Sequence, residues 1–111
     1  MPREGMGEIE HFVLAALLRL DGESYGVPIL EEIATRTERA VSRPSVYIAL
    51  RRLESKGLVT SRLGEATPER GGRAKRYFRL TRAGARQLEQ TRLAFERMWQ
   101  GLTPASRRTA R

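Results

Sequence analysis

Arginine and hydroxyl side chains are concentrated in two stretches of this sequence, where they are suited to binding a polyanion. The first stretch lies within residues 43–52 and carries Arg43, Ser45, Tyr47, Arg51 and Arg52. The second carries Arg70, Gly71, Gly72, Arg73, Lys75 and Arg76. Arginine offers a rigid fork of donors to phosphates and base edges, and glycines let backbone N–H groups approach phosphates. Together the two stretches predict a surface that binds nucleic acid.

The distribution of charge supports the same prediction. The 111-residue chain has a formal net charge of +8. Residues 1–40 carry 4 basic and 8 acidic side chains, residues 41–82 carry 11 basic and 3 acidic, and residues 83–111 carry 6 basic and 2 acidic. A concentrated basic block beside an acidic segment indicates a polyanionic partner, most commonly nucleic acid. A solvated basic face without any partner is the alternative.

Residue types that perform catalysis or bind metals are scarce. The sequence has no cysteine, which excludes disulfides and thiolate sites, and its one histidine, His11, has no second histidine to join. No Ser-His-acid order, phosphate loop or carboxylate pair stands out. We therefore expect a protein that is not an enzyme and has no cofactor. The sequence shows no secretion signal or membrane span, and we expect a cytoplasmic location.

Apolar periodicity predicts three helices that would position the first basic stretch. The first helix has an apolar stripe formed by Ile9, Phe12, Val13, Ala16, Leu17 and Leu20. The second begins near Ser24 as N-cap, with Pro28 in its first turn. The third starts near Ser42, has Pro44 in its first turn and stops at Gly57. Its buried side is predicted to be Val46, Ala49, Leu50 and Leu53.

A change of period after Gly57 predicts a β-hairpin followed by a last helix. Residues 58–63 and 75–80 are rich in strand formers, and the polar, glycine-rich residues 64–74 between them indicate a long hairpin tip. Thr81 is the expected cap of the last helix. Leu88, Phe95 and Leu102 recur at seven-residue intervals in it, which is typical of a short helix-pairing seam.

These elements predict a mainly α fold with a small β-hairpin, which is the winged helix-turn-helix arrangement. We expect the DNA-binding domain over residues 8–80, a C-terminal dimerisation helix over residues 81–102 and a disordered basic tail over residues 103–111. The third helix is slim enough to enter a major groove, and the hairpin would follow the DNA backbone or minor groove. The predicted DNA-binding residues are Arg43, Ser45, Tyr47, Ile48, Arg51, Arg52, Arg70, Gly71, Gly72, Arg73, Lys75 and Arg76.

Three segments of the chain resemble the PadR-like transcriptional regulators. They are Tyr25-Gly26 with Ile29 and Ile33, residues 44–59 (PSVYIALRRLESKGLV) and residues 76–84 (RYFRLTRAG). Each segment alone is weak, but the three in order are specific, and the resemblance covers about residues 8–100. It implies a homodimeric repressor that binds a pseudo-palindromic operator in double-stranded DNA. It also implies that Tyr47 and Arg51 contact DNA and that the hairpin arginines contact its backbone.

The sequence departs from the family pattern at two places. The family commonly has proline directly after the tyrosine of the third helix, whereas this chain has Ile48, which is suited to an apolar contact with a thymine methyl group. One helix follows the hairpin, which leaves little protein for a ligand pocket. Some family members bind planar or phenolic effectors between subunits, so the resemblance implies an aromatic effector as an open alternative.

The last helix carries the residues predicted to form the dimer, namely Leu88, Arg92, Phe95, Met98, Trp99 and Leu102. Packing between subunits is the favoured interpretation of Trp99, the single tryptophan. The second interpretation is that Phe95, Met98 and Trp99 line an intersubunit site for a planar aromatic effector. Two function classes therefore remain: a transcriptional repressor, and a winged helix that serves as a protein-interaction module. We expect no membrane association, because the basic block lacks an aromatic amphipathic helix.

Overall fold

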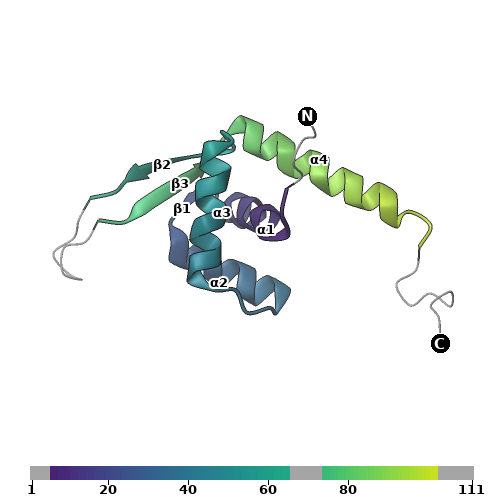
Figure 1. The fold of residues 1–111 in the computed structure, drawn as a ribbon, viewed down its shortest axis with the longest axis horizontal. Helices are drawn as coiled ribbons and strands as arrows, with labels where there is room; N and C mark the ends of the chain where they lie inside the picture. The colour runs from purple at the N-terminus through teal and green to yellow at the C-terminus, as the bar shows by residue number, and fades with distance from the viewer. Residues whose placement is uncertain (1–5, 66–73, 103–111) are drawn as a thin grey trace.

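The computed structural model describes residues 6–65 and 74–102 of the chain, and Figure 1 shows their arrangement. In chain order the elements are α1 (Glu8–Arg19), β1 (Glu23–Ser24), α2 (Gly26–Thr37), α3 (Arg43–Ser55), β2 (Val59–Leu63), β3 (Arg76–Leu80) and α4 (Arg82–Trp99). Four helices and a small antiparallel sheet confirm the predicted mainly α fold with a β-hairpin. We refer to the β2–β3 hairpin as the wing. The expected tail, residues 103–111, lies outside the described residues.

The sheet has three strands, whereas the sequence predicted two. Its order is β1-β3-β2, and both pairings are antiparallel. The expectation that Ser24 caps the second helix is wrong, because Ser24 lies in β1 opposite Phe78 and the N-cap of α2 is Tyr25. Positive φ angles of 67° at Asp21 and 92° at Gly22 turn the chain back along β3. A two-residue strand leaves no periodic signal in a sequence.

The core is formed where α1 is enclosed by the other helices and the sheet. Val46, Ala49, Leu50 and Leu53 are buried as predicted, with relative exposures of 3% or less. The apolar stripe predicted for α1 is incomplete, because Leu14 is fully buried as well. Glu10, an acidic residue that is not part of the stripe, is only 6% exposed. Since α1 contacts α2, α3, α4 and β3, it is covered over more than one face.

Local capping interactions determine where α3 begins and ends. The Ser42 hydroxyl accepts a hydrogen bond from the Ser45 N–H at 3.1 Å, as expected for an N-cap serine. Pro44 lies in the first turn, where its missing N–H has no consequence. Gly57 follows the C-cap Lys56 with a φ of 76°, a backbone conformation that glycine adopts without strain. Both boundaries of the predicted third helix are confirmed.

The last helix has a buried half and an exposed half. The Thr81 hydroxyl accepts from the Gly84 N–H at 3.0 Å and caps α4 as predicted. Gly84 and Leu88 are buried, and a Cβ at Gly84 would lie 2.1 Å from the Leu58 carbonyl oxygen. The first turns of α4 are thus packed directly on the chain leading into β2. Its last turns extend beyond the other helices in Figure 1.

Candidate nucleic-acid interface

The outward face of α3 displays the residues predicted to contact DNA. Exposed on it are Arg43, Tyr47, Ile48, Arg51 and Arg52. Ile48 is 53% exposed, an unusual position for a large apolar side chain. Ser45 is half-buried, and its hydroxyl shares a 2.8 Å hydrogen bond with the Ser42 hydroxyl. The surface thus presents cationic, hydroxyl and apolar groups on one slim helix, which are the groups that read base edges in a major groove.

A groove of about 660 Å³ separates α3 from the wing. Its lining consists of Tyr47, Arg51, Glu54 and Ser55 from α3, and of Ser61, Arg76 and Phe78 from the strands. Ser61 pairs with Phe78 and Leu63 pairs with Arg76 in the antiparallel register. Since residues two apart share a face of a strand, Arg76 and Ser61 lie on the sheet face that is turned to α3. The groove therefore places one helix guanidinium and one wing guanidinium around the same open space.

Tyr47 forms part of the helix wall of this groove and is 40% exposed. Its hydroxyl end lies against α2, because a Cβ at Gly26 would be 2.3 Å from the Tyr47 hydroxyl oxygen. Glycine at the start of α2 is thus required for the tyrosine to occupy this place. This contact links the Tyr-Gly and Pro-Ser-Val-Tyr segments on which the family resemblance depends.

The two neighbouring arginines of α3 have different surroundings. Arg52 Nη1 lies 4.0 Å from Glu10 Oε2, and Glu10 Oε1 accepts a 2.9 Å hydrogen bond from Lys56 Nζ. Arg51 lines the groove and has no ion pair among the described residues. Arg51 is therefore available for a bidentate contact with an anion or a guanine edge, whereas Arg52 already faces a carboxylate.

A chain of two hydrogen bonds crosses the groove from α3 to the wing. The Ser61 hydroxyl donates to Glu54 Oε2 at 2.8 Å, and Arg76 Nη1 donates to Ser61 Oγ at 3.1 Å. The Glu54 carboxylate is thus directed to the wing, although Arg51 lies only three residues before it in α3. Ser61 was missed as a site residue, because a serine in a short strand has no distinguishing pattern.

On the opposite face of the sheet, two arginines interact with one carboxylate. Glu23 of β1 accepts from Arg62 at 3.0 Å and lies 3.7 Å from Arg79. The hydrogen bond from Arg62 holds the pKa of the Glu23 carboxyl below its usual value. Arg62 also stacks over the Tyr77 ring at 4.8 Å. Because side chains alternate between the two faces of a strand, Arg76 lies on the groove face. Arg62 and Arg79 lie on the other face, where they interact with Glu23.

Lys75 and the wing tip complete the predicted DNA-binding set. Lys75 is half-buried, and its ammonium lies 5.1 Å from the centre of the Tyr25 ring, on the Tyr25–Tyr77 side of the sheet. Lys75 therefore does not line the α3–wing groove. The other predicted residues, Arg70, Gly71, Gly72 and Arg73, lie outside the described residues.

The second half of α4 exposes a set of large apolar side chains. Phe95, Met98, Trp99 and Leu102 are 58%, 76%, 52% and 62% exposed. A shallow hollow of about 340 Å³ runs along this part of α4, lined by Gln87, Gln90, Thr91, Ala94, Phe95 and Met98. Leu88, grouped with these residues by the sequence, is 9% exposed and belongs to the core of its own chain. Arg92 forms ion pairs with Glu89 and Glu96 on the same helix.

His11 is a residue of α1 that contacts the exposed half of α4. Its ring meets the Phe95 ring edge-on, with 6.2 Å between centroids. Its Nδ1 is buried without a hydrogen-bond partner among the described residues, and burial lowers the pKa of the imidazole. The described residues contain no group of histidine and acidic side chains able to hold a metal ion. The half-buried imidazole is best described as packing against Phe95.

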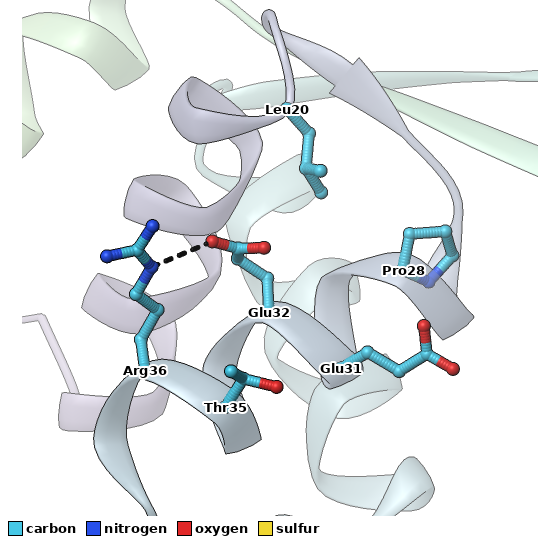
Figure 2. A pocket seen from close by; sticks show the side chains of 6 residues that line it. All are labelled: Leu20, Pro28, Glu31, Glu32, Thr35 and Arg36. Carbon is cyan, nitrogen blue, oxygen red and sulfur yellow. Dashed lines mark hydrogen bonds and ion pairs between the residues drawn. The ribbon is translucent and has the colours of Figure 1, made fainter.

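A second hollow, of about 540 Å³, lies over α2 on another side of the molecule. Figure 2 shows its lining, which comprises Leu20, Pro28, Glu31, Glu32, Thr35 and Arg36. Glu32 accepts hydrogen bonds from Arg36 at 3.2 Å and from Arg19 at 3.0 Å. Arg36, the cation among these lining residues, is already paired with Glu32, and Glu31 adds a further carboxylate, so this hollow is poorly suited to a polyanion. No helix in the described part of the chain is long and apolar enough to cross a membrane.

The arrangement is similar to that of several solved structures. A transcriptional regulator from Clostridium thermocellum matches with a TM-score of 0.68 and 26% identity, covering 82% of this chain and 85% of that one. A PadR family transcription regulator from Clostridium difficile matches with a TM-score of 0.63 and 27% identity, covering 85% and 93%. Bordetella bronchiseptica BpsR, whose DNA binding is regulated by 6-hydroxynicotinic acid, matches in fold with a TM-score of 0.61 and 22% identity, covering 96% and 75%.

The sequence comparison agrees with the structural one. No protein of curated function matches this chain in sequence. Residues 13–90 match the model of the transcriptional regulator PadR-like family. The matched segment contains α3, the groove and the first half of α4, so it includes the described elements that form the candidate interface. The chain therefore belongs to the PadR-like family of transcriptional regulators.

Proposed function

We propose that this chain is a homodimeric repressor that binds a pseudo-palindromic operator in double-stranded DNA through α3 and the wing. The observation that carries the proposal is the α3–wing groove, where Arg51 lacks an ion-pair partner among the described residues and shares the open space with Arg76. α3 would enter the major groove, and the wing would follow the sugar-phosphate backbone. Repression itself is proposed from membership of the family.

The exposed half of α4 supports the homodimer. Four large apolar side chains, each at least half exposed, lie within residues 95–102, three of them in α4 and Leu102 just after its end. A helix pair that covers them removes apolar surface from water, which stabilises association by roughly 25 cal/mol per Å² before the entropy cost of association. A two-fold dimer would present two α3 helices to two half-sites, and the symmetry of the operator would match that of the protein.

A planar aromatic effector is the finer part of the proposal. The support in this chain is the exposed cluster of Phe95, Met98 and Trp99 on α4, which offers aromatic and thioether contacts. In BpsR, which is similar in fold, 6-hydroxynicotinic acid regulates DNA binding. Titrating a panel of planar phenolic and cationic compounds while following Trp99 fluorescence tests this point. An unchanged emission across the panel would remove the effector from the proposal.

The DNA-binding part is tested by measuring affinity for duplexes over a salt series. A duplex selected from a random-sequence library is compared with a scrambled duplex of the same composition by fluorescence anisotropy. We expect tighter binding of the selected duplex and a steep fall in affinity with salt, with a log–log slope of about 0.9 per phosphate contact. Absence of binding to either duplex at low salt would favour the protein-interaction module instead.

The dimer is tested by placing a charge on the exposed half of α4. Phe95→Glu adds a carboxylate to the apolar cluster, and we expect a folded monomer whose unfolding temperature is lowered by the loss of association. Ala83→Glu is the matched control, because it adds the same charge at an exposed position in the first turn of α4. Sedimentation velocity gives the molecular mass of both. Leu88 is unsuitable because it belongs to the core; a Phe95→Glu dimer would exclude this face.

A further inference from the structure

Arg76 lies at the start of β3, at the end of the paired strands nearest the hairpin tip, and its guanidinium donates a hydrogen bond to a serine hydroxyl. Arg76 Nη1 donates to Ser61 Oγ at 3.1 Å. An exposed arginine samples many rotamers, and ordering it on binding costs free energy. A hydrogen bond that restricts the guanidinium before DNA arrives reduces that cost. The contact is between two strands that the register keeps paired, Leu63 with Arg76 and Ser61 with Phe78.

The Ser61 hydroxyl is itself oriented by α3. A serine hydroxyl has one proton and two lone pairs, and it rotates to suit its partners. Here the proton is donated to Glu54 Oε2 at 2.8 Å, which leaves the lone pairs for the Arg76 N–H. A carboxylate acceptor makes this the stronger kind of hydrogen bond. Glu54 thus fixes the rotation of the hydroxyl, and the hydroxyl fixes the guanidinium.

The fixed guanidinium lines the groove opposite the helix wall that contains Arg51. We propose that Ser61 is a positioning residue of the DNA interface, which holds Arg76 at the groove so that the Arg76 guanidinium contacts one backbone phosphate of the bound duplex. This inference rests on the proposed function. It adds to it a residue without charge, in a strand, whose contribution to DNA binding acts through Arg76.

The choice of Ser61 over Glu54 as the residue to substitute follows from charge. Removing the Glu54 carboxylate would also remove a negative charge that repels DNA, so two opposite effects would overlap. Ser61→Ala leaves every charge in place and removes only the hydroxyl. Ser61→Thr keeps the hydroxyl and suits a strand. Thr60→Ala is the matched control, because Thr60 is exposed in the same strand on the opposite sheet face, with no side-chain hydrogen bond among the described residues.

The test is a double-mutant cycle with the selected duplex, read by anisotropy over a salt series. Arg76→Ala is expected to lower the log–log salt slope by about 0.9, as one lost phosphate contact does. Ser61→Ala is expected to weaken binding about twofold to tenfold in the wild-type background. It should have no effect in the Arg76→Ala background, because its partner is already absent. Ser61→Thr and Thr60→Ala should bind as the wild type does.

Three results would overturn the inference while leaving DNA binding intact: an unchanged affinity for Ser61→Ala, an equal loss from Ser61→Ala in both backgrounds, or a loss in Ser61→Thr as large as in Ser61→Ala. Thermal unfolding of each variant identifies a loss that comes from misfolding. A wild-type protein that binds neither the selected nor the scrambled duplex would instead overturn the proposed function, and this inference with it.

Discussion

The α3–wing groove and the α2 hollow have similar volumes, about 660 and 540 Å³, and both contain arginine. They differ in what the arginines contact. In the α2 hollow, Arg36 shares the Glu32 carboxylate with Arg19 of α1. In the groove, Arg51 contacts no carboxylate within the described residues, and Arg76 is held by a neutral hydroxyl. The two hollows therefore have similar size but differ in whether their arginines are already paired with a carboxylate.

A hollow suited to a polyanion is indicated by arginines that are not already paired with carboxylates. The size of the hollow and its number of basic residues indicate less. A guanidinium bound to a carboxylate must lose that partner before it binds a phosphate. The same distinction applies within the sheet, where Glu23 engages Arg62 and Arg79 on one face and leaves Arg76 on the other. Removing one arginine from the groove and one from the α2 hollow, and comparing the two effects on DNA affinity, tests this interpretation directly.

The largest expected effect on DNA binding comes from removing the groove arginine. Arg51→Ala should weaken binding of the selected duplex by about 1–3 kcal/mol and relax base preference at one position, as loss of a bidentate guanine contact does. Arg36→Ala is the matched control, since it removes the same charge from the α2 hollow and should leave DNA affinity nearly unchanged. Anisotropy with single-base variants of the selected duplex measures both affinity and preference.

Two outcomes would break the comparison. Equal losses from Arg51→Ala and Arg36→Ala would mean that overall net charge, and not the groove, determines affinity. A loss from Arg51→Ala that is the same for selected and scrambled duplexes would place Arg51 on a phosphate and remove its role in reading bases.

A smaller effect is expected from the neighbouring arginine. Arg52 lies near Glu10, so its guanidinium is shared between a carboxylate and solvent, and it is 67% exposed. Arg52→Ala should weaken binding of all duplexes about equally and lower the salt slope by about 1, as loss of a phosphate contact does. The salt series on selected and scrambled duplexes gives both quantities. A larger loss of base preference in Arg52→Ala than in Arg51→Ala would reverse the assignment of the two residues.

Much of α3 could be predicted from the sequence, because its determinants are local. The serine cap, the proline in the first turn, the apolar stripe and the terminal glycine all lie within residues 42–57, and each specifies α3 without reference to the rest of the fold. The outward position of Arg51 follows from the same helical period. The buried Leu14 and Glu10 were not predictable in this way, because α1 is covered from several directions by elements distant in sequence.

The parts of the site that were missed depend on contacts between elements. The alternation of residues 76–80 separates Arg76 from Arg79, but it does not say which sheet face is turned to α3. That choice requires β1, whose two residues carry Glu23 to the far face. The bridge through Ser61 likewise needs the register of β2 with β3 and the packing of α3 on the sheet. Leu88 has the seven-residue spacing of the exposed cluster, yet α1 covers it.

The smallest expected effect concerns the α2 hollow itself, at acid pH. Hydrogen bonds from Arg36 and then from Arg19 lower the pKa of the Glu32 carboxyl below its usual value of 4.5. A carboxyl with a lowered pKa in the folded state contributes stability that is fully present above the unfolded pKa. That stability is lost as the pH falls through the folded pKa. Glu32→Gln should therefore unfold at a slightly lower temperature than the wild type at neutral pH, and the difference should shrink as the pH falls below about 4. Because the Glu32–Arg36 pair is exposed to solvent, added salt should reduce the difference as well.

A difference in unfolding temperature that stays constant from neutral to acid pH would mean that packing of the side chain, and not its charge, stabilises this side of the molecule. The ion pair with Glu32 would then not make Arg36 less available to anions than Arg51. The contrast between the two hollows would lose its physical basis.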